Sequence, residues 1–379
     1  MDFELPEDLR HVQRTVREFC EREVAPHARR WDEEETFPWD AVRQLGPLGL
    51  MGIAVPEEYD GAGLGALALA TVVEEIARVD GSLALTVASH NGLGTGHILR
   101  FGDEAQKRRW LPPLARGERL AAWGLTEPGS GSDAAGMRTT AVRRGDRWIL
   151  NGSKTFITQG SVGDVFVVLA RTAPGKAQKG ITAFVVEKGA RGFGQRPLHG
   201  KLGMRSSDTA ELHLEEVEVP DDQRLGEVDR GFVDTLHILD RGRITIGSLA
   251  VGLANGALDA ARAYAKERRA FGRPIADFQA IAFKLADMAT AIDAARLLVR
   301  RAAAAADAGR PFAREASMAK LFASEAAMGA TSEAIQIHGG YGYTKYYPVE
   351  RHFRDAKLCE IGEGTSEVQR IVISRSVLR

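Results

Sequence analysis

The stretch FVDTLHILDRGRITIGSLAVGLANGALDAARAYAKERR, residues 232–269, decides the class of this fold. It reads as one long helix, and two further helical runs follow it over residues 277–308 and 312–338. Runs of this length exceed the mean helix length of about 11 residues and favour a bundle of helices. A last helix is expected to begin near Ser366.

The residues before this bundle have the pattern of a sheet. DVFVVLA (164–170) and ITAFVVE (181–187) read as buried strands, and ELHLEEVEVP (211–220) alternates like a half-buried strand. Asn151-Gly152 lies between two apolar stretches, which predicts a hairpin turn there. The sheet is expected to begin at about residue 120.

The N-terminal part is predicted to be helical. Its apolar residues recur at intervals of four and three, as on one face of a helix, at Leu5, Leu9, Val12, Val16 and Phe19. A second helical run covers residues 64–79, and Pro112 and Pro113 mark a break further on. We therefore predict an N-terminal helical domain, a middle β-domain and a C-terminal helical bundle, with the limits 1–119, 120–225 and 226–379.

Composition narrows the class of protein. Of the 379 residues, 44% are apolar and 27% charged, as in an ordinary globular protein. Lys plus Arg number 50 against 51 for Asp plus Glu, so the charge predicts neither a nucleic-acid partner nor an anionic membrane partner. Cys20 and Cys359 make no disulfide framework and fit a reduced cytoplasmic setting. The acidic N-terminus is no secretory signal, and no stretch approaches the roughly 18 consecutive apolar residues of a membrane-spanning helix.

Two segments rich in glycine and hydroxyl groups are candidate ligand sites. GLTEPGSGSDAAG (124–136) has small residues that let a backbone approach a planar or phosphorylated ligand, although a plain polar loop fits equally well. In NGSKTFITQG (151–160), Phe156 and Thr158 share one face of a strand and are suited to flank a ring cofactor. Such a strand end is more often ordinary sheet.

Two further segments lie near the ends of the C-terminal helices. In QIHGGYGYT (336–344) the paired glycines are typical of a helix C-cap, or else let a backbone approach a diphosphate, and His338 is interpreted as structural. In RDAKLCEIGEGTSEVQR (354–370), Ser366 begins a capping-box pattern that places a helix start there. Glu363, just before it, is either a solvated turn residue or a mobile base.

Several common sites are excluded by the sequence. The strings GAGLG at Gly61 and GLGTG at Gly92 neither follow a strand nor have the spacing of a dinucleotide fingerprint. No Cys/His cluster has zinc-ligand spacing, and no G-x-S-x-G nucleophile elbow occurs.

The four segments, in this order, resemble the acyl-CoA dehydrogenase family over essentially the whole chain. GLTEPGSGSD and residues 336–355 are similar to the two signature regions of the family, supported by KLGMRSSDT (201–209), ERRAFGRPIADFQ (267–279) and the EGTSE ending. The resemblance implies a mainly α fold with an N-terminal helical domain, a β-barrel-like middle domain and a C-terminal four-helix bundle. It also implies noncovalent FAD between the β-domain and the bundle, in a homotetramer whose flavin sites take residues from a neighbour.

The resemblance implies roles for individual residues. Trp123, Leu125 and Thr126 lie along the flavin pyrimidine, Phe156 stacks near the isoalloxazine ring, and the Thr158 hydroxyl bonds the reactive flavin nitrogen. Positions near the flavin diphosphate and the CoA arm are Gly131 and Ser132. Positions that hold the adenosine diphosphate across a subunit interface, or lie near the adenine, are Arg268, Phe271, Gln279, Gln336, Gly340, Thr365 and Glu367. The implied substrate-binding positions are Ser132, Asp240, Arg243 and Gly364.

The family places its catalytic base at one of two positions. The commoner one is Glu363 in this chain, and the other falls on Gly242, which cannot act as a base. The resemblance therefore implies that Glu363 removes the α-proton. Three residues depart from the usual pattern: Tyr346 replaces an acidic residue, Phe156 a frequent Trp, and Gly362 a frequent Tyr beside the base.

The implied reaction is FAD-dependent α,β-dehydrogenation of a saturated acyl-CoA to a trans-2-enoyl-CoA, with electrons passing to electron-transfer flavoprotein. Burial of Glu363 is expected to raise its pKa toward the working pH, against the opposing effect of the following helix N-terminus. Two alternatives stay open, namely an oxygen-using oxidase of the same fold and a non-catalytic flavin- or acyl-CoA-binding homologue. The acyl chain, and with it the choice between fatty-acid β-oxidation and branched amino-acid breakdown, also stays open.

Overall fold

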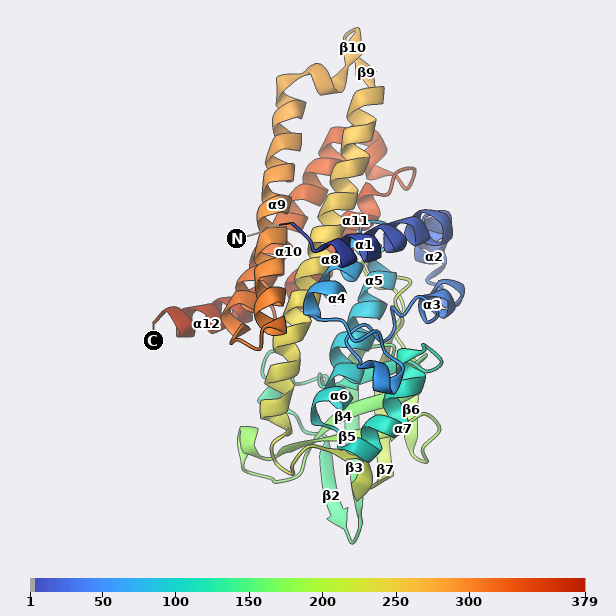
Figure 1. Ribbon diagram of the computed structural model, residues 1–379, viewed down its shortest axis with the longest axis vertical. Coiled ribbons are helices and arrows are strands. Elements are labelled where there is room, and N and C mark those ends of the chain that lie inside the picture. Colours follow the sequence, from blue (N-terminus) through green and yellow to red (C-terminus); the bar gives the residue numbers. More distant parts are fainter. Residues whose placement is uncertain (1–3, 379) are drawn as a thin grey trace.

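The computed structural model describes residues 4–378 and has a helical part, a sheet and a second helical part in chain order (Figure 1). Residues 1–3 and Arg379, at the ends of the first and last predicted domains, lie outside the described residues. The mainly helical fold with a middle sheet, predicted from the sequence, is confirmed. The predicted domain limits fall between α7 and β1 and between β8 and α8.

The N-terminal helices pack around a largely apolar pair, α4 and α5. The elements of this part are α1 (Glu7–Phe19), η1 (Cys20–Val24), α2 (Ala28–Glu34), α3 (Trp39–Leu45), η2 (Glu57–Tyr59), α4 (Ala66–Ala77), α5 (Gly81–Ser89), η3 (His90–Thr95), α6 (Gly96–Phe101) and α7 (Glu104–Ala115). Val16 and Phe19 of α1 are buried, as the spacing of the apolar residues predicts. α4 is buried nearly all round because α1, α8 and α9 all contact it.

Pro112 and Pro113 do not break the chain, so that prediction was wrong. Both lie inside α7, whose N-cap Asp103 forms a capping box with Gln106. The helix continues past the two missing N–H donors because the large side chains of Trp110 and Leu111 are buried in the core. Burial of these groups outweighs the local preference for a break.

The middle part is an eight-stranded sheet in the order β6-β7-β3-β2-β4-β5-β8, with β1 paired to β4 in parallel. Its strands are β1 (Ala121–Gly124), β2 (Thr140–Arg144), β3 (Arg147–Thr158), β4 (Val165–Arg171), β5 (Ile181–Glu187), β6 (Phe193–Pro197), β7 (Thr209–Pro220) and β8 (Arg224–Leu225). β4 is buried on both faces: Val167 packs in one cluster with Trp110 of α7, and Phe166 in another with Leu150 and Leu212. This confirms the two predicted buried strands and the half-buried β7.

Asn151-Gly152 is not a hairpin turn, contrary to the prediction. β3 runs straight through both residues, with a register shift between Leu150 and Gly152 where it pairs with β7. The Asn151 amide completes this bulge by accepting from Glu216 N–H and donating to the Glu216 carboxylate. The turn between β2 and β3 lies instead at Gly145, where φ is +64°.

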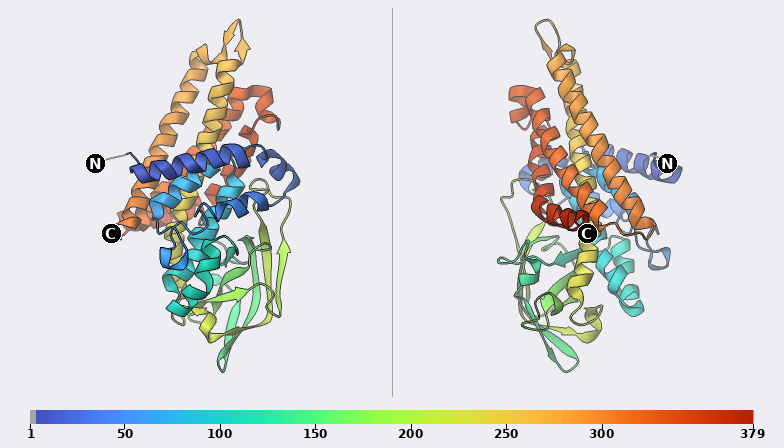
Figure 2. Two further views of the ribbon diagram at one scale, coloured as in Figure 1. Left: turned by 45° about the vertical axis from the view of Figure 1, so that its right-hand side comes forward. Right: turned by 90° about the vertical axis from the view of Figure 1, so that its left-hand side faces the viewer.

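The C-terminal part is a helical bundle around α8. Its elements are α8 (Gly231–Glu267), β9 (Arg269–Ala270), β10 (Arg273–Pro274), η7 (Ile275–Asp277), α9 (Gln279–Asp307), α10 (Ala313–His338), η8 (Gly339–Tyr343), α11 (Val349–Ile361) and α12 (Ser366–Val377). α8 contacts α4, α9, α10 and α11. The hairpin of α8 and α9 projects beyond the other helices and carries β9 and β10 at its tip (Figures 1 and 2).

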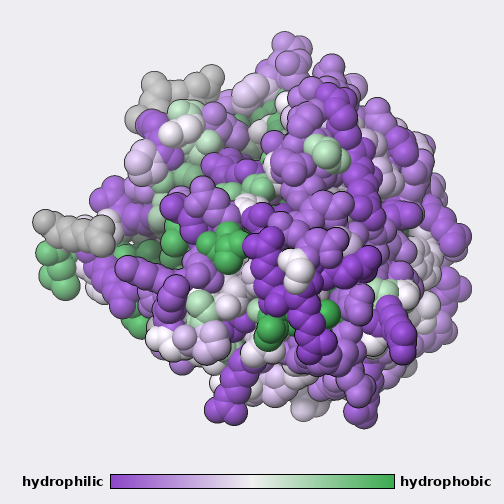
Figure 3. Space-filling view, turned by 90° about the horizontal axis from the view of Figure 1, so that it is seen from below, coloured by the Kyte–Doolittle hydropathy of each residue, from purple (hydrophilic) through white to green (hydrophobic). Residues whose placement is uncertain are grey.

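One described helix, α8, is long and apolar enough to cross a membrane by length and composition alone. However, 78% of its most apolar window is buried inside the protein, as expected for the central helix of a bundle. The face at the sheet end of the molecule is mostly hydrophilic, with hydrophobic residues in small patches (Figure 3).

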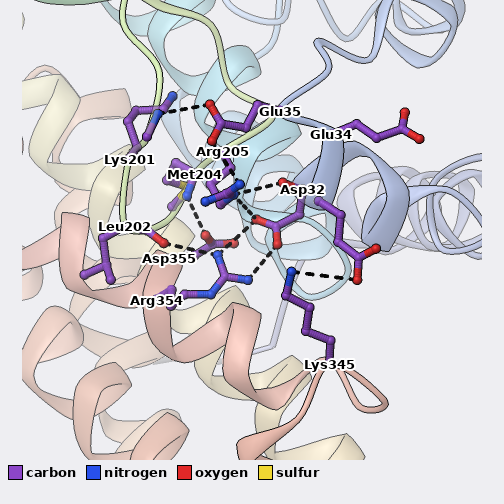
Figure 4. A network of polar contacts seen from close by, with 12 residues as sticks. Asp32, Glu34, Glu35, Lys201, Leu202, Met204, Arg205, Lys345, Arg354 and Asp355 are labelled. Carbon is purple, nitrogen blue, oxygen red and sulfur yellow. Dashed lines mark hydrogen bonds and ion pairs between the residues drawn. The ribbon is translucent and has the colours of Figure 1, made fainter.

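A polar network joins the N-terminal helices, the β6–β7 connection and α11 (Figure 4). Arg354 of α11 donates to both carboxylate oxygens of Asp32, at 3.0 and 2.6 Å. The neighbouring Asp355 accepts the Met204 N–H at 2.5 Å. These contacts fix the KLGMRSSDT segment against the helix that leads into the Glu363 loop.

Candidate active site

Glu363 lies in the short connection between α11 and α12, opposite Gly242 of α8. Its φ is +53°, and the next residue, Gly364, has φ +93°. A Cβ atom at position 242 would lie 1.6 Å from Glu363 Oε2. The carboxyl group therefore occupies space that α8 leaves open only because it carries glycine at this position.

The Glu363 carboxyl group is poised to hold or release a proton near neutral pH. The residue as a whole is half-buried, but Oε2 is fully buried and has no hydrogen-bond partner among the described residues. Burial raises its pKa to about 7, while the positive charges of Lys320 and Arg243 act in the opposite direction. The expected rise of this pKa is therefore present before any substrate binds.

The backbone after Glu363 is held by hydrogen bonds. Lys320, on α10, is fully buried and donates from Nζ to the Gly364 carbonyl oxygen at 2.7 Å. Gln369 donates from Nε2 to the same oxygen at 2.8 Å. Nothing in the sequence analysis singled out Lys320. The one hint in the sequence is that Lys320 is a basic residue within the Ala-rich helical run 312–338.

The helix after Glu363, α12, begins at Ser366 as predicted, but a different residue caps it. Thr365, not Ser366, is the N-cap of α12, and its side chain accepts from the Val368 N–H. The predicted capping box does not form because Gln369 turns back to Gly364 instead. Glu367 is exposed in the first helical turn, where a carboxylate favours the helix dipole.

Asp240 and Arg243 face each other one turn apart on α8. Arg243 Nη1 lies 2.5 Å from Asp240 Oδ1 and 3.4 Å from Ser317 Oγ of α10. The negative charge of Glu363 acts to raise the pKa of Arg243, and the positive charge of Arg243 acts to lower the pKa of Glu363. Arg243 Nε is buried and lacks a hydrogen-bond partner among the described residues.

A buried ion pair joins the loop that follows β1 to strand β3. Lys154 of β3 is fully buried and donates to Glu127 Oε1 at 2.8 Å and to the Leu125 carbonyl at 3.2 Å. The Thr155 N–H donates to the Thr126 carbonyl at 2.9 Å. Lys154 lies inside the NGSKTFITQG segment, but the residues around it do not by themselves predict a role for it.

The π-helix η3 connects this loop to the Glu363 region. Thr245 Oγ1 donates to the Gly242 carbonyl, and a Cβ at Gly92 of η3 would lie 3.9 Å from that hydroxyl. A Cβ at Gly94 would lie 2.7 Å from the Ala121 Cβ of β1. Gly94 in the GLGTG string thus lets η3 lie close to β1. Trp123 of β1 donates to the His97 ring, just after this string, at 3.1 Å.

The other predicted flavin positions of the sheet lie at its surface. Phe156 is 70% exposed and has φ +58°, an unusual conformation for a bulky residue. Thr158 is half-buried at the end of the same strand. Gly131 and Ser132 lie in the loop after Thr126, where a Cβ on Gly131 would meet nothing within 4 Å.

The remaining predicted residues lie far from Glu363, at the tip of the bundle. Arg268 lies over the Tyr341 ring, beside Gly340 and the end of α10 that carries Gln336, while Gln279 begins α9. Phe271 is 96% exposed. Along α8, the 25 residues from Gly242 to Glu267 span about 38 Å. One chain therefore does not bring the two groups of residues together.

Comparison with known proteins gives a consistent result over the whole chain. Residues 6–118, 122–217 and 229–378 match the family descriptions acyl-CoA dehydrogenase N-terminal, middle and C-terminal domain, respectively. The chain is 47% identical over 379 residues to the short-chain specific acyl-CoA dehydrogenase of Clostridium acetobutylicum, covering 100% of both chains.

Two solved structures superpose closely. One is described as the three-dimensional structure of butyryl-CoA dehydrogenase from Megasphaera elsdenii, with 42% identity and a TM-score of 0.98. The other is described as the electron transferring flavoprotein of Acidaminococcus fermentans, with 46% identity and a TM-score of 0.99. Both similarities cover 100% of each chain.

Proposed function

Because this chain belongs to the acyl-CoA dehydrogenase family, we propose that it removes two hydrogens from a short saturated acyl-CoA, with Glu363 as the base. The observation that carries this proposal is the buried Glu363 Oε2, which has no partner among the described residues and faces Gly242. The similarity to short-chain and butyryl-CoA dehydrogenases supports a short acyl chain.

The environment of Glu363 suits proton abstraction from carbon. A general base works best when its pKa lies near the working pH, and burial raises that of Glu363 to about 7. The α-proton beside a thioester is weakly acidic, so charge on the thioester oxygen also needs stabilisation. We expect the Glu363 N–H to donate to that oxygen, and one such donor is typically worth ~3–4 kcal/mol.

The family is a flavoprotein family, and the residues present fit FAD. When bound, FAD would accept the hydride that leaves the β-carbon. Phe156 offers an exposed aromatic face in a strained backbone conformation, which marks functional sites more often than ordinary loops. Thr158 offers a hydroxyl, and the backbone at Gly131 is open to a phosphate because no atom lies within 4 Å of a Cβ there.

The tip of the bundle supports a homotetramer in which a neighbour completes each site. Arg268 and Phe271 lie about 38 Å along α8 from the Glu363 region, so they would serve a cofactor held mainly by another subunit. Phe271 and Tyr343 are 96% and 90% exposed, and exposed aromatic groups of this size favour burial in an interface.

We further propose electron-transfer flavoprotein as the electron acceptor and the cytoplasm as the location. The first follows from family membership and from the solved structure described by that name. The alternative acceptor is oxygen, as in an oxidase of the same fold, and the two differ in their product. Release of peroxide in air during turnover would identify the oxidase.

Anaerobic titration of the purified flavoprotein tests the proposal. Butyryl-, isovaleryl-, octanoyl- and palmitoyl-CoA are added in turn, and we expect butyryl-CoA to bleach the flavin absorbance most efficiently. Glu363→Gln is expected to slow bleaching by about 10²–10⁴-fold while flavin stays bound. If Glu363→Gln bleaches at the wild-type rate, the base is another residue. If dithionite but no ester bleaches the flavin, the substrate class is wrong.

A further inference from the structure

Lys320 is a buried cation close to the proposed base but without a role in the chemistry described so far. Its side chain is fully buried on α10, and its hydrogen bond to the Gly364 carbonyl uses one of its three N–H donors. Burying an ammonium group is unfavourable unless nearby charges and hydrogen bonds replace the lost water. The position therefore needs an electrostatic partner.

Charged and titratable groups face Lys320 from three elements, namely Arg243 of α8, Cys359 and Glu360 of α11, and Glu363 of the connecting loop. Burial raises the pKa of the Cys359 thiol to about 12, so this group stays neutral. Glu360 accepts a hydrogen bond from Lys357 at 2.6 Å. Of the two carboxyl groups, Glu363 is the one with a buried oxygen that lacks a partner in the described part of the chain.

We propose that Lys320 is a positioning residue for the catalytic base. Its hydrogen bond holds the left-handed turn at Glu363 and Gly364 against α10, and its positive charge favours the ionised carboxylate. A turn with φ of +53° at a non-glycine residue is strained, so it persists only where the surroundings fix it. This inference rests on the proposed function of Glu363 and adds a group that does not touch the substrate.

The two groups are expected to give activity a pH window. Burial raises the pKa of Glu363 to about 7, against the effects of Lys320 and Arg243. Burial lowers the pKa of Lys320 to about 8, against the effects of the neighbouring acidic groups. Glu363 is therefore ionised while Lys320 is still protonated only over a narrow range, so kcat rises through about pH 7 and falls above about pH 8.

The test compares Lys320→Met, which removes both charge and donor, with Lys320→Arg, which keeps both. Lys320→Met is expected to lower kcat for butyryl-CoA about 10- to 100-fold with little change in KM, because a small displacement of the base costs that much. The acidic limb of its pH profile moves to higher pH, since the ionised Glu363 loses a stabilising charge. Lys320→Arg is expected to restore the limb toward its wild-type position.

Lys357→Met is the matched control because it removes an exposed lysine on α11 that pairs with Glu360. This variant is expected to leave kcat unchanged, along with the rise and the fall of its pH profile. If the Lys320→Met enzyme folds, binds flavin and has the kcat and pH profile of wild type, the proposal is wrong, but Glu363 can still be the base. Wild-type bleaching by Glu363→Gln, by contrast, overturns the proposed function itself.

If Lys320→Met does not fold, the wild-type profile decides. A kcat that falls between pH 8 and 9 in wild type, with the fall moved to higher pH in Lys320→Arg, supports the proposal. A kcat that stays flat from pH 8 to 10 in wild type overturns it, because loss of the Lys320 charge would then have no effect on the base.

Discussion

Gly242 and Glu363 share one space: a Cβ atom on residue 242 would lie 1.6 Å from Oε2 of Glu363. The two alternative base positions implied by the family resemblance are therefore spatial neighbours in this fold, although 121 residues separate them in the sequence. A side chain at position 242 would therefore force the Glu363 carboxyl group to move away from its present place.

This contact predicts strong coupling between the two positions. Gly242→Ala is expected to displace the carboxyl group and lower kcat by about 10²-fold, because errors of about 1 Å in position have effects of this size. Adding Glu363→Asp shortens the base by one methylene and relieves the clash. The double variant is expected to lose less activity than the sum of the two single changes in activation free energy. Additive losses in this double-mutant cycle would show that the two side chains do not compete.

The stability of the protein is predicted to depend on Glu363 ionisation. Burial raises the folded-state pKa from 4.5 to about 7, so folding favours the protonated form. This stabilisation is complete below about pH 4.5 and is lost as the pH rises through 7. Glu363→Gln, which stays neutral, is therefore expected to melt at a higher temperature than wild type at pH 8, with the difference vanishing near pH 4.5. Thermal unfolding of wild type and Glu363→Gln at pH 8 and pH 4.5 checks this prediction. The same difference in melting temperature at the two pH values would contradict it.

The buried pair of Lys154 and Glu127 is predicted to stabilise the loop at Trp123–Thr126. Lys154→Met leaves the Glu127 carboxylate buried with only the backbone N–H groups of Arg138 and Thr139. Such a loss is expected to destabilise the protein by about 3–5 kcal/mol and to reduce bound flavin. Adding Glu127→Gln removes the uncompensated charge and is expected to recover part of the stability. Denaturant unfolding and flavin content of the single and double variants measure this, and a double variant less stable than Lys154→Met would contradict it.

Gly362 is predicted to influence which acyl chains fit beside the base. Its φ is −67° and ψ 150°, and a Cβ there would meet Leu358 no closer than 3.5 Å, so neither the backbone nor the packing requires glycine. Gly362→Ala is expected to keep or slightly raise stability, by about 0.4–1 kcal/mol at most. Gly362→Tyr is expected to lower kcat/KM for isovaleryl-CoA more than for butyryl-CoA. Equal losses for both esters would show that position 362 does not line the acyl pocket.

The sequence by itself determined the order of the parts, the long helices of the bundle, the buried strands and the loop that carries Glu363. These features follow from spacing of apolar residues and from turn residues, which act within a few positions along the chain. Predictions from local sequence were wrong where contacts with residues distant in the sequence determine the backbone conformation. Asn151-Gly152 became a bulge because β3 continues alongside β7, and Pro112 and Pro113 stayed helical because α7 is buried.

Only the tertiary structure decided how the candidate site is assembled. It set Glu363 against Gly242, raised the pKa of the carboxyl group by burial, and enclosed Lys320 and Lys154 as charged anchors of two loops. It also separated the residues near Glu363 from those at the bundle tip by about 38 Å. Contacts between residues more than a hundred positions apart depend on how helices and strands pack, and no local pattern in the sequence records that packing.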